Sequence, residues 1–418
     1  MSTSRNPAID LLRGGAIGVV LLLHFALAYG LRDSALADWL GPAAVRTLAY
    51  NGNFGVTVFF TVSGYLITSM ALSRHGTLAR LSWRDFAWRR VARILPGLLL
   101  ALAVVVPLGL AGHPSFRNAH GDVPMAPGFM GVVVASVLTC WHNVLMARDG
   151  YFNYAVNVYW SLSVEEVFYV ALPLACVAAG ALARRGHARA SRWWLGGLAL
   201  ACLVAGPADR YAHADDEIRY LYDNLACADA LALGCLVAVA LRRRAGVGSG
   251  VDLAGGPVLT PLARGAWTLG GVAGLVAVYA AGIDGHVTWG FTGIALATAA
   301  VLVGSASTGE PGVAADTSGG WRLLAPVRWL GSIVRWMGRH SYELYLFHIV
   351  VLGLLREAVP RATVTHDARL PLLLAFVAAS CLVAGTVAAW VTEPANRALR
   401  AAALARAQAR TDGRRLAA

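Results

Sequence analysis

The chain has 418 residues, of which 57% are hydrophobic and 14% are charged. Because a soluble globular domain carries about 25% charged residues, this composition excludes that class and indicates a polytopic membrane protein. The formal net charge of +12 comes from arginine alone, since the sequence has no lysine, and in so apolar a chain it does not indicate nucleic-acid binding. The six cysteines show no CxxC spacing, so they predict neither a disulfide framework nor a metal site.

Apolar runs recur along the whole sequence, and each approaches the ~20 residues needed to cross a hydrocarbon core about 30 Å thick. The candidate spans are 11–30, 54–73, 94–111, 161–181, 193–208, 225–241, 266–282, 288–304, 337–356 and 370–391. We therefore expect an all-α fold with about ten transmembrane helices. The membrane domain is expected over residues 1–400, with an arginine-rich cytoplasmic tail over 401–418.

The distribution of arginine predicts the orientation, because basic residues concentrate in cytoplasmic loops. Arginine-rich segments alternate with balanced or acidic ones: 74–93, 182–192 and 242–244 against 31–53 and 209–224. This alternation holds only if the apolar segment 128–146 does not cross, so we expect it to lie in the interface or to re-enter. Both termini are then cytoplasmic.

The first apolar run, LLRGGAIGVVLLLHF (11–25), contains an arginine and a histidine. On a helix, Arg13 and His24 are about 16 Å apart along the axis and roughly 20° apart around it, so they share one face. Ionisable groups at membrane depth are costly and by default suggest a functional site. A snorkelling arginine and a histidine in the core would give the same pattern.

Two further motifs follow in the second and third spans. FFTVSGYLIT places Ser63 and Gly64 in mid-helix, where close helix packing alone would explain the small residues. RRVARILP places Arg90 and Arg93 three residues apart, as neighbours at the start of a helix. Guanidinium groups bind phosphate through paired hydrogen bonds, so these arginines suggest a phosphate site. The alternative is the ordinary positive charge of a cytoplasmic loop.

Polar residues also enter the later spans. WSLSVEEVFY places Glu165 and Glu166 side by side, one turn after Ser161. Two carboxylates inside an apolar span are costly unless they are hydrogen-bonded or partly protonated, which predicts the wall of a polar cavity. An arginine partner that holds helices together is the alternative. SYELYLFH aligns Tyr345 and His348 on one helical face and supplies a second intramembrane histidine.

Together these motifs resemble the acyltransferase-3 family of integral membrane O-acyltransferases. Arg13 with His24, FFTVSGYLI, RVARI with Pro96, WSLSVEEVFY, SYELYLFH and TEPANR occur in the family's order and cover residues 9–397. The resemblance implies transfer of an acyl group, most often acetyl, from cytoplasmic acyl-CoA to a hydroxyl of a glycan, a glycolipid or a secondary metabolite. It also implies a multi-pass protein of the inner (cytoplasmic) membrane that uses acyl-CoA as a co-substrate and holds no permanent cofactor.

The resemblance assigns catalysis to His24, Glu165 and Glu166. The residues expected to bind acyl-CoA are Arg13, Arg90 and Arg93. The side chains expected to support the reaction are Ser63, Ser161, Tyr345 and His348.

In the expected mechanism, His24 deprotonates the acceptor hydroxyl. One of the glutamates, Glu165 or Glu166, orients His24, while a hydroxyl group stabilises the developing oxyanion. Direct transfer and an acyl-histidine intermediate both stay open. A multi-pass transporter or a proton-coupled channel would use the same intramembrane groups and is the main alternative. A non-catalytic partner in envelope assembly is a third.

Overall fold

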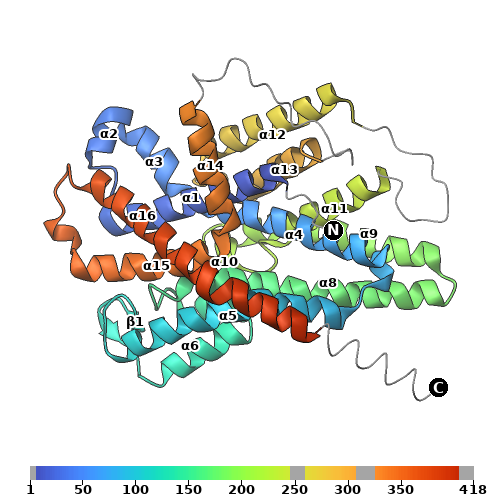
Figure 1. Cartoon of the computed structure of the whole chain (residues 1–418), viewed down its shortest axis with the longest axis horizontal. Helices are drawn as coiled ribbons and strands as arrows, with labels where there is room; N and C mark the ends of the chain where they lie inside the picture. The colour runs from blue at the N-terminus through green and yellow to red at the C-terminus, as the bar shows by residue number, and fades with distance from the viewer. Residues whose placement is uncertain (1–5, 245–258, 307–324, 404–418) are drawn as a thin grey trace.

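The computed structural model describes residues 6–244, 259–306 and 325–403, and most of these are helical (Figure 1). The α-helices are α1 (Pro7–Tyr29), α2 (Ala35–Leu40), α3 (Pro42–Tyr50), α4 (Asn53–His75), α5 (Trp83–Leu110), α6 (Phe129–Leu138), α7 (His142–Asp149), α8 (Trp160–Arg184), α9 (Ala188–Ala212), α10 (Glu217–Tyr222), α11 (Ala228–Arg244), α12 (Pro261–Ala281), α13 (Val287–Gly304), α14 (Ala325–Arg339), α15 (Ser341–Ala358) and α16 (Arg369–Val387). Shorter elements are the 3-10 turns η1 (Leu78–Arg80), η2 (Asn157–Tyr159) and η4 (Arg361–Thr363), and the π turn η5 (Ala388–Thr392). Two-residue strands, β1 (Ala119–His120) and β2 (Val123–Pro124), pair antiparallel.

Each of the ten predicted apolar segments overlaps a long helix, although the bounds differ. Within the described ranges, seven helical stretches are long and apolar enough to cross a membrane, and they include α1, α4, α5, α8, α12, α13 and α16. The protein is therefore an all-α polytopic membrane protein. The total of ten crossings and the side of each terminus stay predictions. Of the expected tail, residues 404–418 lie outside the described part of the chain.

The segment 128–146 folds as two short helices, α6 and α7, separated by Cys140 at a positive φ of 65°. The longer of them has 10 residues. At 1.5 Å per residue it extends about 15 Å, only half the thickness of a hydrocarbon core. Neither helix is long enough to cross by itself, in agreement with the expectation that this segment does not form a span.

The predicted span 337–356 is wrong at its start. The helix is interrupted at His340, so residues 337–339 end α14 and the next helix, α15, begins at Ser341. The sequence prediction missed α14 because arginine at positions 328, 335 and 339 lowers its hydropathy while its other face is apolar. Helix α14 runs across the direction of most long helices (Figure 1) and packs closely on α1.

Glycines allow the closest helix contacts. A Cβ atom on Gly64 of α4 would collide with the carbonyl oxygen of Leu231, and one on Gly234 of α11 would collide with that of Thr61. The two helices therefore pack backbone to backbone, as small residues permit in membrane proteins. Close packing, the simpler explanation of Gly64, is thus confirmed.

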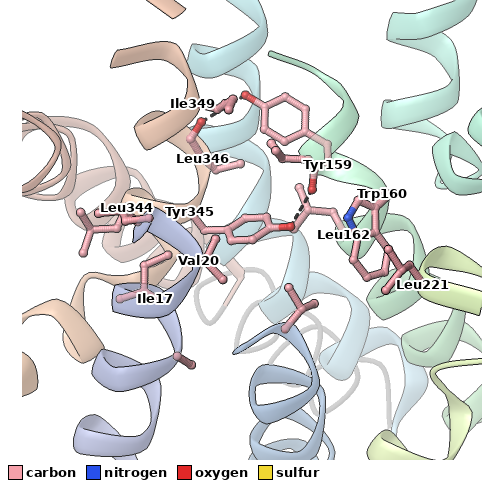
Figure 2. Packing of buried hydrophobic residues seen from close by; sticks show 14 of the residues in the cluster. Ile17, Val20, Tyr159, Trp160, Leu162, Leu221, Leu344, Tyr345, Leu346 and Ile349 are labelled. Atoms are coloured by element: carbon pink, nitrogen blue, oxygen red, sulfur yellow. Dashed lines mark hydrogen bonds between the residues drawn. The ribbon is translucent and has the colours of Figure 1, made fainter. Parts of the chain in front are cut away.

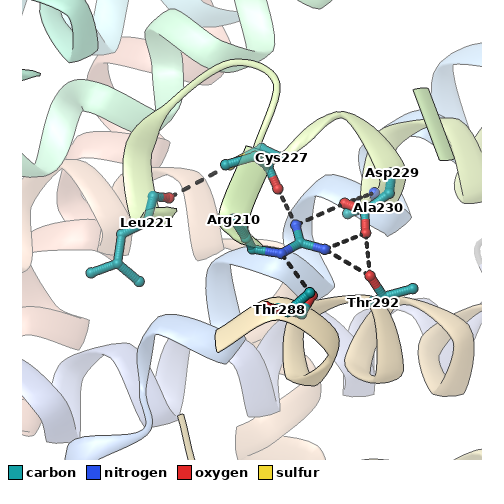
Figure 3. A network of polar contacts seen from close by, with 8 residues as sticks. Arg210, Leu221, Cys227, Asp229, Ala230, Thr288 and Thr292 are labelled. Carbon is teal, nitrogen blue, oxygen red and sulfur yellow. Dashed lines mark hydrogen bonds and ion pairs between the residues drawn. The ribbon is translucent and has the colours of Figure 1, made fainter. Parts of the chain in front are cut away.

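A buried ion pair joins three helices (Figure 3). Arg210 of α9 and Asp229 of α11 are 2.7 Å apart, and each side chain is only 1% exposed. Arg210 also donates to Thr292 of α13 at 2.7 Å and to the backbone oxygen of Thr288 at 3.1 Å. Because its charge is matched and its donors are used, this cluster ties α9, α11 and α13 together.

Candidate active site

Five helices, α1, α4, α5, α8 and α15, line a partly open cavity with a volume of about 750 Å³. Seven of the ten predicted site residues line it: Arg13, Ser63, Arg90, Arg93, Ser161, Glu165 and Tyr345. The rest of the wall is mainly apolar, with Phe59, Phe60 and Leu66 of α4 among its residues. The cavity thus combines guanidinium groups with an apolar lining, which suits a ligand that is anionic at one end and apolar at the other.

Arg90 is buried and its charge is matched by both glutamates of α8. Its Nη2 atom lies 3.5 Å from Glu165 Oε2 and 3.6 Å from Glu166 Oε1. The guanidinium also lies 3.4 Å from the ring centroid of Tyr169, a cation–π contact. These contacts agree with the alternative explanation of the glutamates, in which an arginine pairs with them and so holds α5 and α8 together.

Glu165 has further partners on neighbouring helices. Ser63 Oγ donates to Glu165 Oε1 at 2.7 Å, and the hydroxyl of Tyr169 donates to Oε2 at 2.8 Å. With Arg90, this gives the carboxylate partners from α4, α5 and α8. Tyr169 was missed as a site residue, although its position four residues after Glu165 places both side chains on one face of the helix.

Arg93 lies one turn after Arg90 and also lines the cavity. In the described part of the chain, no carboxylate lies within the 4.0 Å of an ion pair with Arg93. Glu165 and Glu343 act on it only from farther away. A guanidinium at a cavity wall without a directly paired carboxylate could pair with an anionic ligand.

His24 does not line the cavity. Its Nδ1 atom lies 2.9 Å from the carbonyl oxygen of Val20 and 3.4 Å from Nε2 of His348. Neither glutamate contacts it, so the expectation that Glu165 or Glu166 orients His24 is not met. The physical reason is that both carboxylates are held about Arg90.

Tyr345 borders both the cavity and His348. Its side chain reaches from α15 past Ile17 and Val20 of α1 toward the start of α8 (Figure 2). It lines the cavity, while its ring centroid lies 5.9 Å from that of His348. The cavity that Arg13 lines therefore does not include His24, and Tyr345 is a lining residue that also lies close to His348.

The three hydroxyl groups expected to stabilise an oxyanion have other acceptors. Ser63 donates to Glu165 at 2.7 Å, and Ser161 donates to the hydroxyl oxygen of Tyr345 at 2.7 Å. Tyr345 in turn donates to the carbonyl oxygen of Val158 at 2.6 Å. Because a hydroxyl carries a single proton, none of the three can donate to a substrate in this arrangement. Their expected role as oxyanion donors is not supported.

A second polar contact was also missed. Thr392 donates to Glu343 at 2.7 Å, and both residues are buried where α15 meets the π turn η5. The two positions are far apart in the sequence and share no motif, so no local signal could have paired them.

The fold and the cavity define a helical membrane protein with an arginine-lined internal site. Residues 6–392 match the family model described as an acyltransferase domain, so the chain belongs to the acyltransferase-3 family and is an acyltransferase. The resemblance seen in the six motifs is thereby confirmed, and family membership favours an enzyme over a transporter or a channel.

Curated relatives match over part of their length. The peptidoglycan O-acetyltransferase OatA of Listeria monocytogenes is 29% identical over 168 residues, which are 40% of this chain and 23% of the relative. The putative peptidoglycan O-acetyltransferase YrhL of Bacillus subtilis is 28% identical over 195 residues, 45% of this chain and 29% of the relative. The O-acetyltransferase OatA of Staphylococcus aureus is 27% identical over 171 residues, which are 40% of this chain and 24% of the relative. The matches thus cover less than a third of each relative. Comparison with solved structures finds no significant match.

Proposed function

We propose that this acyltransferase moves an acetyl group from acetyl-CoA, bound from the cytoplasmic side of the inner membrane, to a hydroxyl group of an envelope glycan. The observation that carries the proposal is the cavity lined by Arg13, Arg90 and Arg93, in which no carboxylate of the described residues lies at ion-pair distance from Arg93. The phosphates of CoA are the kind of anion that guanidinium groups hold best. The donor is a co-substrate that leaves after each turnover, and no permanent cofactor takes part.

The acceptor class rests on the relatives. Two of them are named as peptidoglycan O-acetyltransferases, one of these as putative, and peptidoglycan is a glycan with free hydroxyl groups. A glycan acceptor is therefore favoured over a glycolipid or a secondary metabolite.

In the proposed reaction, His24 is the general base. The acceptor hydroxyl transfers its proton to the imidazole while its oxygen attacks the thioester carbonyl carbon. The C–S bond then breaks, and the imidazolium returns the proton to the CoA thiolate. General-base catalysis of this kind contributes about 10²–10⁴-fold to a rate.

In the proposed route, the donor passes Tyr345 on its way to His24. Tyr345 lines the cavity and its ring centroid lies 5.9 Å from that of His348, so we propose that this side chain rotates when the thioester arm is bound. Its hydrogen bonds with Ser161 and the Val158 carbonyl oxygen would break in that motion.

The test is an acetyl-transfer assay on membranes that contain the full chain, with radiolabelled acetyl-CoA and isolated cell-wall glycan. We expect His24→Ala to lower kcat by about 10²–10⁴-fold at an unchanged protein level. We expect Arg93→Ala to raise the KM for acetyl-CoA at least about tenfold, because a charge-assisted hydrogen bond contributes about 1.5–3 kcal/mol.

Arg148→Ala is the matched control, since Arg148 is an exposed arginine that pairs with Asp149 away from the cavity. It should leave both kinetic constants unchanged. An unchanged KM in Arg93→Ala would show that the donor does not bind in the cavity. Full activity in His24→Ala would show that this histidine takes no part in the reaction.

A further inference from the structure

His348 lies beside His24 and is completely buried on α15. Its Nδ1 atom is 2.8 Å from the carbonyl oxygen of Tyr345 and 3.0 Å from that of Leu344. Carbonyl oxygens only accept hydrogen bonds, so Nδ1 carries a proton. A second proton would create a buried charge with no carboxylate among its contacts in the described chain, which is very costly. His348 is therefore a neutral imidazole whose Nε2 atom presents a lone pair.

This lone pair points at His24. The Nε2 atom of His348 is 3.4 Å from His24 Nδ1, and the two rings meet edge to face with centroids 4.9 Å apart. The other neighbour of His24 Nδ1 is the carbonyl oxygen of Val20 at 2.9 Å. Both neighbours are acceptors, so Nδ1 of His24 carries the proton and shares it between them. A neutral imidazole has one N–H group, which leaves Nε2 of His24 unprotonated.

We propose that His348 is a positioning residue, which fixes the tautomer and orientation of His24 so that its Nε2 atom is the base. The inference rests on the proposed role of His24. In a hydrolase triad a carboxylate does this work and also stabilises the imidazolium. A neutral histidine holds the ring without placing a negative charge in the membrane core, which would need its own compensation.

The opposite tautomer of His24 is disfavoured at this position. With the proton on Nε2, the lone pair of Nδ1 would face the Val20 oxygen and the lone pair of His348. His348 could turn its own proton toward His24 only by giving up its hydrogen bonds to Tyr345 and Leu344. The two residues thus determine each other's protonation.

The test compares three variants of His348 in the membrane assay. In His348→Gln the amide oxygen can take the place of Nε2 as the acceptor, whereas the shorter side chain in His348→Asn does not reach His24, and His348→Phe fills the space without an acceptor. We expect His348→Gln to keep kcat within about threefold. We expect His348→Asn and His348→Phe to lower it by about 10–100-fold, less than loss of the base itself. The KM for acetyl-CoA should not change, since the arginines are untouched. Equal losses in the Gln and Asn variants would overturn the proposal.

A second measurement does not depend on whether the His348 variants fold. Nitrogen-15 solid-state NMR of the unmodified protein, with His24 assigned by difference from His24→Gln, reports which ring nitrogen carries the proton. We expect a protonated Nδ1 and a bare Nε2, and a protonated Nε2 would overturn the inference. The outcomes are separable from the proposed function, because activity in His24→Ala tests the base while the tautomer tests what His348 does.

Discussion

The two glutamates of α8 are adjacent in sequence but differ in their contacts. Glu165 accepts from Ser63 and Tyr169 and lies 3.5 Å from Arg90. Among the described residues, Glu166 has an ion-pair contact with Arg90 alone, at 3.6 Å. Removing either carboxylate leaves the other to neutralise Arg90, so the two single variants differ mainly in the hydroxyl groups that lose their acceptor.

We expect Glu165→Ala to destabilise the protein more than Glu166→Ala. A buried donor without an acceptor costs about 1–3 kcal/mol, and Glu165→Ala leaves two of them, on Ser63 and Tyr169. Thermal unfolding in detergent, followed by tryptophan fluorescence, measures the difference. Glu165→Gln, which keeps an acceptor oxygen, should lie between the two. Equal melting temperatures for both alanine variants would mean that these hydrogen bonds do not support the fold.

At this scale, the sequence predicted which residues face the interior but not which residues touch. Arg13 and Arg93 line the cavity, because polar side chains on an apolar helix turn inward and helical periodicity is local. Contacts between helices depend on rotation and depth, which no single motif encodes. For that reason Glu165 was expected at His24 but lies at Arg90, while His348 took the place beside His24.

At the scale of helices, the apolar segments were predictable because hydropathy is a property of each segment alone. The amphipathic α14 was missed, since its arginines dilute the hydropathy and its packing partner α1 lies far away in the sequence. The closest contacts between helices, at Gly64 and Gly234, follow from the absence of a side chain, which hydropathy does not report.

The contact of α4 with α11 makes a direct prediction. A Cβ atom at Gly234 would collide with the carbonyl oxygen of Thr61, so Gly234→Ala must push the helices apart. We expect a loss of about 1–3 kcal/mol, the usual cost of overpacking. Gly270→Ala on α12 is the control, because no atom lies within 4 Å of the added Cβ and alanine favours a helix. Thermal unfolding should show a lower melting temperature for the first variant alone, and equal curves would contradict the close contact.

For the whole molecule, the family and the all-helical membrane architecture were predictable from the sequence. The orientation in the membrane is still a prediction from the distribution of arginine. The junction of α8 and α9 is rich in arginine, at position 185 in the loop and at positions 184, 189 and 192 in the adjoining helix ends, whereas the segment after α9 is acidic. Because basic loops stay in the cytoplasm, α9 should run from the inside to the outside. The donor site proposed above needs this orientation, since acetyl-CoA is supplied from the cytoplasm.

Cysteine labelling of intact cells tests this orientation. Ala188, at the start of α9, and Ala214, two residues after its end, are exposed, so each can be changed to cysteine in a chain whose native cysteines have been replaced. We expect a membrane-impermeant maleimide to label Ala214→Cys in intact cells, and to label Ala188→Cys only after the membrane is permeabilised. Labelling of both after permeabilisation is the control for access. The reverse pattern would place the arginine-rich loop outside and would remove the cytoplasmic route by which acetyl-CoA is proposed to reach Arg93.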